Sequence, residues 1–211
     1  IRKTHQIEKL EQQGATIYIK HSTDNIKTHQ NISAVIISSA ISDKNEEYQW
    51  AKLNHIPIFK RAEMVDKIMK TFPRNIAISG THGKTTTTAM VTKILEGTRI
   101  NPSYLIGANR LDNGENANYS RSDVLVTEAD ESDGSFLFLS PSTIIVTNIE
   151  QDHMDFFESE SNLVHHFFLF LETAVKKNGH LVLNQDDKIV QSFISKFPGA
   201  NIVSYGIKNK S

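Results

Sequence analysis

The stretch IAISGTHGKTTTT, residues 76–88, contains the clearest structural signal in this chain. It starts with a short apolar, β-branched run, which is typical of a buried strand. The strand is followed by the turn Gly80-Thr81-His82-Gly83. Glycines let backbone N–H groups curl around an anion, and a helix N-terminus adds partial positive charge. A strand, a glycine turn and a helix in this order therefore predict a loop that holds phosphate groups.

The residues after the turn support the same prediction. Lys84 can reach the outer phosphates of a bound nucleotide, and a hydroxyl of the threonines that follow can ligate Mg²⁺. A helical pattern continues over residues 89–96. The match is to the short form G-x-x-G-K-T, since the strict phosphate-loop pattern has a glycine where this chain has Ile78. The alternative is an ordinary strand-to-helix turn.

Composition excludes several classes of protein. The 211 residues suffice for one or two domains, and a net charge of -1 argues against a large basic face for nucleic acid. The chain has no cysteine, so it can form neither disulfides nor thiolate metal sites, which fits the cytoplasm. The longest apolar run, residues 167–171, is far too short to span a membrane. We therefore expect a cytoplasmic protein without nucleic-acid or membrane partners, and the sequence does not indicate an oligomeric state.

The two ends of the chain suggest a longer parent. The chain starts at Ile1 without a methionine and enters a helical pattern almost at once, and it ends at Ser211 just after a predicted strand. We expect both ends to be cut from something longer.

The segment before residue 74 alternates strands and helices. A proline in the strand at residues 56–59 favours an edge position. We predict helices over 3–13, 46–54 and 62–72, strands over 15–19, 34–37 and 56–59, and a polar turn over 21–25.

The segment from residue 74 shows the same alternation. We predict helices over 84–96, 160–177 and 187–196, and strands over 76–78, 104–106, 124–127, 143–147, 181–183 and 202–204. Such alternation indicates parallel sheets with right-handed crossovers. The predicted fold class is α/β with two parallel-sheet units, a partial Rossmann-like unit over 1–73 and a phosphate-loop unit of ATPase type over 74–211. The boundary is placed at Pro73-Arg74, because the strand of the phosphate loop begins directly after it.

Two further segments have a structural interpretation. The Asn- and Gly-rich segment 107–122 is interpreted as a mobile surface loop. Phe167, Phe168, Phe170 and Leu171 recur at helical spacing, which favours a buried core face over an aromatic cofactor site.

Carboxylates gather where the strand at 124–127 ends. Glu128, Asp130, Glu131 and Asp133 lie within six residues, and such groups repel one another unless they share a cation. Ligands of open α/β sheets bind at this end of the strands, and Glu128 is placed like the acid that completes a Mg²⁺ site. The alternative for all four is a solvated acidic turn.

Two other strand ends carry polar residues of interest. His153 follows the strand at 143–147 among carboxylates and could ligate a metal or orient a phosphate, although a lone histidine is usually a surface or core residue. Ser38 and Ser39 end the strand at 34–37 and could bind a phosphate or a sugar. The alternative interpretation is that these serines are only small residues at the end of a strand.

The motifs together resemble a known family. GTHGKTTTT at 80–88, EADESDGSF at 128–136 and TNIEQDHMD at 147–155, in this order, resemble the cytoplasmic Mur ligases of peptidoglycan synthesis. SSAI at 38–41 and RAEM at 61–64 also resemble the first domain of these enzymes. EADESDGSF is most similar to the member that adds the first amino acid.

The resemblance implies roles for individual residues. Gly80, Thr81, His82, Gly83, Lys84, Thr85 and Thr86 would cradle the phosphates of ATP, and Lys84 would neutralise their charge. Thr85, Glu128 and His153 would serve Mg²⁺ directly or through water. The expected catalytic residues are Lys84, Glu128 and His153. Ser38, Ser39, Asp130 and Ser132 would lie toward a nucleotide-sugar.

The implied reaction joins L-alanine to the lactyl carboxylate of UDP-N-acetylmuramate, with ATP as energy source and an acyl phosphate as intermediate. The family also has a glycine-rich turn for uridine diphosphate and a closing third domain. This sequence shows neither, so we expect the chain alone not to ligate. The alternatives are a related ligase such as murein tripeptide ligase or folylpolyglutamate synthase, a phosphate-loop kinase or NTPase, and a nucleotide-binding fragment without activity.

Overall fold

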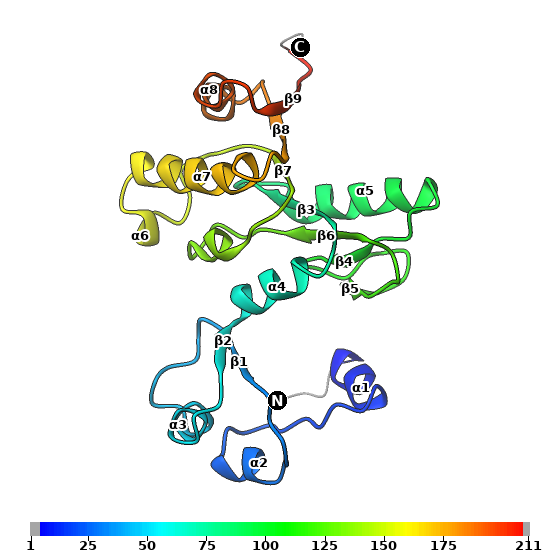
Figure 1. The fold of residues 1–211 in the computed structure, drawn as a ribbon, viewed down its shortest axis with the longest axis vertical. Helices are drawn as coiled ribbons and strands as arrows, with labels where there is room; N and C mark the ends of the chain where they lie inside the picture. Colours follow the sequence, from blue (N-terminus) through cyan, green and yellow to red (C-terminus); the bar gives the residue numbers. More distant parts are fainter. Residues whose placement is uncertain (1–4, 209–211) are drawn as a thin grey trace. The chain divides into compact units, whose positions relative to one another are not determined.

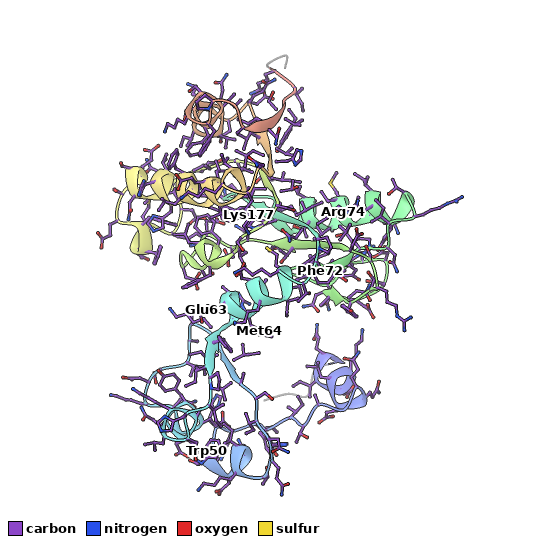
Figure 2. All side chains as sticks on the ribbon, viewed as in Figure 1. Trp50, Glu63, Met64, Phe72, Arg74 and Lys177 are labelled. Carbon is purple, nitrogen blue, oxygen red and sulfur yellow. The ribbon has the colours of Figure 1, made fainter. Side chains whose placement is uncertain are left out.

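The computed structural model describes residues 5–208, and the chain divides into two compact units, Ile1–Met64 and Val65–Ser211 (Figure 1). The first unit contains a two-stranded sheet in which β1 and β2 pair in parallel, with Ile36 opposite Phe59. Its elements are α1 (His5–Gln12), α2 (Thr23–Lys27), β1 (Val35–Ile37), α3 (Glu46–Leu53), which carries Trp50 (Figure 2), and β2 (Ile58–Lys60). The parallel pairing agrees with the prediction.

Two local predictions in the first unit are wrong. Residues 15–19 form no strand, because β1 and β2 pair only with each other in the described sheet, and a strand without a ladder partner leaves its backbone groups unpaired. Residues 21–25 are not a plain turn, since Ser22 caps the short helix α2 by accepting a hydrogen bond from the N–H of Asp24 at 3.3 Å. Residues 3 and 4 of the first predicted helix lie outside the described residues.

The second unit is built on a seven-stranded sheet of order β5-β4-β6-β3-β7-β8-β9. All neighbours pair in parallel except β4 and β5, so the predicted parallel α/β fold is confirmed and gains one antiparallel edge strand. The strands are β3 (Arg74–Ser79), β4 (Ser103–Leu105), β5 (Ala117–Asn118), β6 (Val124–Glu128), β7 (Thr143–Val146), β8 (His180–Asn184) and β9 (Asn201–Tyr205).

Helices cover both faces of this sheet. The helical elements are α4 (Arg61–Met69), α5 (Lys84–Gly97), η1 (Ser135–Phe138), α6 (Met154–Phe157), α7 (Glu160–Val175) and α8 (Lys188–Lys196). Alternate residues of β6 enter different cores: Leu125 packs in a cluster with residues of α7 and α8, whereas Val124 and Val126 pack in a cluster with residues of α5. Because successive side chains of a strand point to opposite faces, α5 lies on one face and α7 and α8 on the other.

The phenylalanines of α7 are core residues, as their spacing predicts. Phe167, Phe170 and Leu171 are fully buried, and Phe168 packs against the same cluster. No helix within the described residues is both long and apolar enough to cross a membrane.

Segment 107–122 is more ordered in its contacts than a simple surface loop. It contains β5, and its Arg110 is buried, with its guanidinium 2.6 Å from Glu96 Oε1 and 2.7 Å from Asp112 Oδ2. The hydrogen bonds that Arg110 donates to Glu96 and Asp112 raise the pKa of the guanidinium above its ordinary value, and the hydrogen bonds from Arg110 and Lys93 lower the pKa of Asp112 to about 2. A buried cation with two carboxylate partners ties the segment to α5.

The division of the chain into two units falls inside α4, between Met64 and Val65. Met69 and Phe72 belong to the core of the second unit, and Figure 2 labels Phe72 together with Arg74, the first residue of β3. The boundary between Pro73 and Arg74 stays a prediction.

Candidate phosphate-binding site

The loop between β3 and α5 lies at the carboxyl edge of the sheet, next to the ends of two other strands. The N–H of Ala129, just after β6, donates to Ile78 O at 2.8 Å. On the other side, the N–H of Thr147, just after β7, donates to Ser79 O at 3.0 Å. The three motif-bearing segments therefore meet at one edge, because the carboxyl ends of adjacent parallel strands lie together.

The segment after β7 holds the loop in its shape. Thr81 N–H donates to Asn148 O at 3.0 Å, and His82 N–H donates to Asn148 Oδ1 at 2.9 Å. The Thr147 hydroxyl donates to His82 O at 2.7 Å. The N–H groups of Thr81 and His82 are engaged in these contacts, whereas the N–H groups in the first turn of α5, which a helix cannot pair internally, are available to an anion.

Gly80 is required by this close approach. It has a φ of 132°, and a Cβ at this position would lie 2.2 Å from Thr147 Oγ1 and 2.9 Å from Asn148 O. A side chain there would clash with the residues that follow β7. It would also force a non-glycine residue into a backbone conformation that L-residues rarely adopt. The glycine therefore lets the loop pack directly on the segment after β7.

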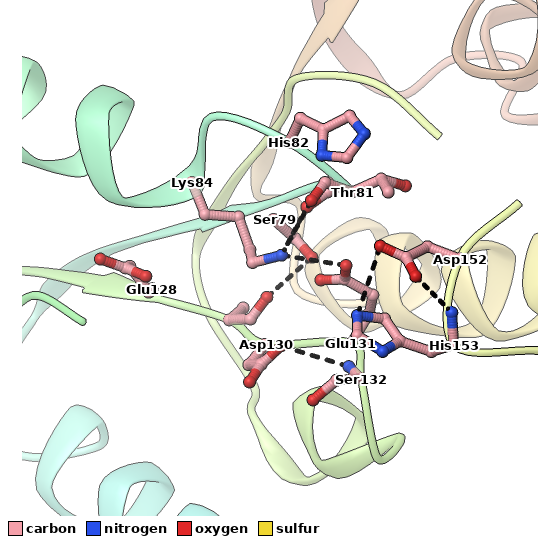
Figure 3. A network of polar contacts seen from close by, with 12 residues as sticks. Ser79, Thr81, His82, Lys84, Glu128, Asp130, Glu131, Ser132, Asp152 and His153 are labelled. Atoms are coloured by element: carbon pink, nitrogen blue, oxygen red, sulfur yellow. Dashed lines mark hydrogen bonds and ion pairs between the residues drawn. The ribbon is translucent and has the colours of Figure 1, made fainter. Parts of the chain in front are cut away.

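The Lys84 ammonium sits inside the loop (Figure 3). It donates to Gly80 O at 2.8 Å, to Thr81 O at 3.3 Å and to Glu131 Oε1 at 2.9 Å. The lysine side chain is 16% exposed and that of Glu131 only 1%. A buried ion pair of this kind forms at the position where the sequence places a phosphate-binding lysine.

Glu131 is the residue that sequence reasoning did not single out. Burial raises the pKa of its carboxyl more than the neighbouring Lys84 lowers it, so the pKa lies above its ordinary value. Its Oε2 atom is buried and has no hydrogen-bond partner among the described residues. The acidic cluster was a visible signal, but spacing could not show which of its four carboxylates turns toward the lysine.

Thr85 and Glu128 come together as predicted. Glu128 Oε2 accepts a hydrogen bond from the Thr85 hydroxyl at 3.1 Å, and Oε1 accepts from the N–H of Gly107 at 2.6 Å. A carboxylate and a hydroxyl side by side are the oxygen ligands that Mg²⁺ prefers. The backbone N–H of Gly107, which the sequence did not suggest, fixes the orientation of the carboxylate.

His153 lies at the start of α6, in the segment that follows β7. It occupies the left-handed backbone region with a φ of 54° at the start of α6, and its Nε2 lies 3.7 Å from Asp152 Oδ2. Figure 3 shows His153 and Glu128 on opposite sides of the Lys84–Glu131 pair in that view. The described contact of its side chain is with Asp152, and its metal role stays a prediction.

The other carboxylates of the acidic cluster each accept a backbone hydrogen bond. Asp130 is exposed and accepts from the N–H of Ser132 at 3.2 Å, and Asp133 accepts from the N–H of Ser135 at 3.0 Å. Each carboxylate has its own donor, which relieves the repulsion that the sequence suggested. Among the described residues no three His, Asp or Glu side chains gather as a metal-binding group.

Ser38 and Ser39 belong to the first unit. They are exposed and follow β1, as predicted from the sequence. Their role toward a nucleotide-sugar, like that of Asp130 and Ser132, stays a prediction.

The sheet order and the loop between β3 and α5 define an α/β protein of the phosphate-loop class. Two family models match the chain: the Mur ligase family, catalytic domain, over residues 1–73, and the Mur ligase middle domain over residues 78–211. The chain belongs to the Mur ligase family, which confirms the resemblance seen in its motifs.

Curated relatives are similar over nearly the whole chain. The UDP-N-acetylmuramate–L-alanine ligase of Dictyoglomus turgidum is 39% identical over 201 residues, which cover 95% of this chain and 42% of that protein. The ligase of the same name from Vesicomyosocius okutanii is 41% identical over 202 residues, covering 96% of this chain and 42% of that protein. This chain thus spans about two fifths of the length of these relatives.

Solved structures show the same fold. The UDP-N-acetylmuramate-alanine ligase of Thermotoga maritima matches with a TM-score of 0.80 and 28% identity, over 99% of this chain and 46% of that one. The UDP-N-acetylmuramate:L-alanyl-gamma-D-glutamyl-meso-diaminopimelate ligase of Neisseria meningitides matches with a TM-score of 0.85 at 21% identity, over 97% of this chain and 67% of that one. The second likeness concerns the fold alone.

Proposed function

We propose that the protein containing this chain is an ATP-dependent ligase that joins L-alanine to the lactyl carboxylate of UDP-N-acetylmuramate. The observation that carries the proposal is the site at the carboxyl edge of the sheet, where Lys84 lies within the phosphate loop and the Thr85 hydroxyl lies 3.1 Å from Glu128. Identity of 39–41% to proteins named UDP-N-acetylmuramate–L-alanine ligase supports the choice of substrates.

The chemistry needs two anions to meet. The substrate carboxylate attacks the γ-phosphorus of ATP, the bond to ADP breaks, and an acyl phosphate forms. The uncharged amine of L-alanine then attacks the acyl carbon, phosphate leaves, and the amine gives up a proton as the amide forms. In this proposal the Lys84 ammonium offsets the charge of the phosphates, and the loop Gly80–Thr86, which includes Thr81, His82 and Gly83, holds them against the N-terminus of α5.

The oxygen ligands present fit Mg²⁺. Thr85 and Glu128 would hold it at the edge of the sheet, with His153 contributing from the start of α6. Bound Mg²⁺ would supply charge neutralisation on the phosphate oxygens. The N–H of Gly107, 2.6 Å from Glu128 Oε1, supports this role because it orients the carboxylate beside Thr85.

Residues of both units would bind the nucleotide-sugar. Asp130 and Ser132 in the second unit, and Ser38 and Ser39 in the first, would contact the nucleotide-sugar. The partners are then small molecules, namely ATP, L-alanine and UDP-N-acetylmuramate, with no nucleic acid and no membrane. The absence of cysteine is compatible with a cytoplasmic site of action.

The test is phosphate release by the protein containing this chain, given ATP, Mg²⁺, UDP-N-acetylmuramate and amino acids. We expect release that depends on L-alanine and on the nucleotide-sugar, and its loss in Lys84→Ala with the circular dichroism spectrum unchanged. Release that needs a tripeptide instead of L-alanine would assign the chain to the wall-recycling ligases. Release without either acceptor would indicate a kinase or NTPase, and full activity of Lys84→Ala would overturn the site.

A further inference from the structure

All three N–H groups of the Lys84 ammonium have an acceptor in this structure. An ammonium carries three N–H donors, and the acceptors here are Gly80 O at 2.8 Å, Thr81 O at 3.3 Å and Glu131 Oε1 at 2.9 Å. The proposed function, on which this inference rests, requires the same ammonium to contact phosphate oxygens. At least one of the three contacts must therefore be exchanged when a nucleotide binds.

Glu131 is the contact that a phosphate would replace. The other two acceptors are neutral carbonyl groups of the loop itself, three and four residues before the lysine, and they move with it. Of the three acceptors, Glu131 alone carries negative charge, as a phosphate does. In this structure the Glu131 carboxylate is thus the anionic partner of the ammonium, and a nucleotide phosphate would take over that part on binding.

The surroundings of Glu131 do not explain it as a purely structural residue. Its side chain is 1% exposed, and its Oε2 atom has no partner within the part of the chain that the structure describes. Burying a carboxylate with one oxygen unpaired is unfavourable, and burial raises its pKa. A fully paired structural carboxylate would be expected to have donors for both oxygens.

We propose that Glu131 is a positioning residue for Lys84: it pairs with the ammonium within the phosphate loop and gives the ammonium up when a nucleotide binds, so that it limits nucleotide affinity. Two effects act in the same direction. The carboxylate competes with phosphate for one ammonium, and its negative charge repels phosphates bound beside it. The benefit is that Lys84 stays folded into the loop, with its side chain 16% exposed, when no nucleotide is bound.

The test compares Glu131→Gln with the unaltered protein in calorimetric titrations with ATP and with ADP, each with Mg²⁺. The amide keeps the shape and an oxygen that can accept from Lys84 but removes the charge. We expect about tenfold tighter binding, which corresponds to about 1.4 kcal/mol. Glu131→Asp keeps the charge but shortens the reach, so its affinity should lie between the two.

The matched control is Glu172→Gln on α7. Glu172 pairs with Lys176 at 2.7 Å on the surface, and both side chains are more exposed than the Lys84–Glu131 pair. This variant should bind nucleotide like the unaltered protein. In steady-state ligation Glu131→Gln should lower the KM for ATP without raising kcat, a split that a loss of stability alone would not produce.

Equal or weaker nucleotide binding by Glu131→Gln, with its thermal unfolding preserved, would overturn the inference. If that variant does not fold, Glu131→Asp decides the question, since weaker binding than the unaltered protein would overturn it as well. Failure of the unaltered protein to bind any nucleotide would instead count against the proposed function. The two failures are thus distinguishable.

Discussion

At the scale of single residues, the two glycines of the phosphate loop have different reasons to be glycine. Gly80 has a φ of 132° and no room for a Cβ, which would meet Thr147 Oγ1 at 2.2 Å. Gly83 has a φ of 84° but open space, since the nearest atom to its Cβ would be Thr87 Oγ1 at 3.9 Å. Backbone strain alone would oppose a side chain at Gly83, whereas both strain and overlap oppose one at Gly80.

This difference predicts two distinct costs. Gly83→Ala should lower the free energy of unfolding by about 1–2 kcal/mol, the usual cost of a left-handed alanine. Gly80→Ala should cost more than this, because the segment at Thr147 must also move. Urea unfolding of the two variants checks the prediction. Equal stability of the two would mean that the close approach of the loop to Thr147 is not maintained in solution.

A second residue-scale prediction concerns the metal. Glu128→Gln keeps the hydrogen bond to Gly107 N–H possible but removes the charge beside Thr85. We expect it and His153→Ala to raise the Mg²⁺ concentration for half-maximal ligation by roughly tenfold or more, while affinity for UDP-N-acetylmuramate changes little. Magnesium titrations of the ligation rate measure this. A Mg²⁺ requirement unchanged in either variant would remove that residue from the proposed metal site.

At the scale of elements, α4 is tied to the segment before β7 by a polar contact. Asp66 Oδ1 accepts from the N–H of Ser140 at 2.9 Å and from its hydroxyl at 2.6 Å, and Lys70 Nζ lies 2.5 Å from Oδ2. Burial raises the pKa of Asp66, but the hydrogen bonds from Lys70 and Ser140 together lower it by more. The pKa of Asp66 therefore lies below its ordinary value. The ionised carboxylate is therefore the form that holds α4 in place.

The sign of this shift gives a pH prediction. Because the pKa is lower in the folded than in the unfolded protein, the stabilisation is present above the unfolded value near 3.8 and is lost as the pH falls through the folded value. Asp66→Asn should therefore be less stable at neutral pH by about 1–3 kcal/mol. The difference should shrink below about pH 4, where the aspartate itself takes up a proton. Chemical unfolding at several pH values checks this, and a difference independent of pH would contradict it.

At the scale of the whole molecule, the buried core is concentrated in the second unit. All members of both described apolar clusters come from residues 65–211, and among the described residues of the first unit only Ala51 is a buried apolar residue. The second unit therefore has the apolar interior needed to fold cooperatively by itself.

This distribution predicts how pieces of the chain fold. Residues 65–211 expressed alone should unfold cooperatively. Residues 74–211 should be less stable by on the order of 5 kcal/mol, because they lack the buried Met69 and Phe72. Thermal unfolding of the two pieces measures the difference, and it also tests the sequence-based boundary at Pro73-Arg74. Equal stability of the two pieces would support that boundary.

Sequence alone accounts for the α/β fold of the second unit and for part of the site. Thr85 and Glu128 could be placed side by side because both follow parallel strands, and the carboxyl ends of such strands meet at one edge. The helices α5, α7 and α8 and the core face of α7 could be predicted because helical periodicity is a local property of the chain.

Other features were decided only by the tertiary structure. Residues 15–19 have the composition of a strand, but a strand also needs a partner, and local sequence does not encode whether one is adjacent. The choice of Glu131 as the partner of Lys84 depends on how the turn after β6 directs four closely spaced carboxylates. The shape of the phosphate loop likewise depends on Asn148, 66 residues away from the His82 it binds. Such contacts join residues distant in sequence, so they exist only once the sheet has set β3, β6 and β7 side by side.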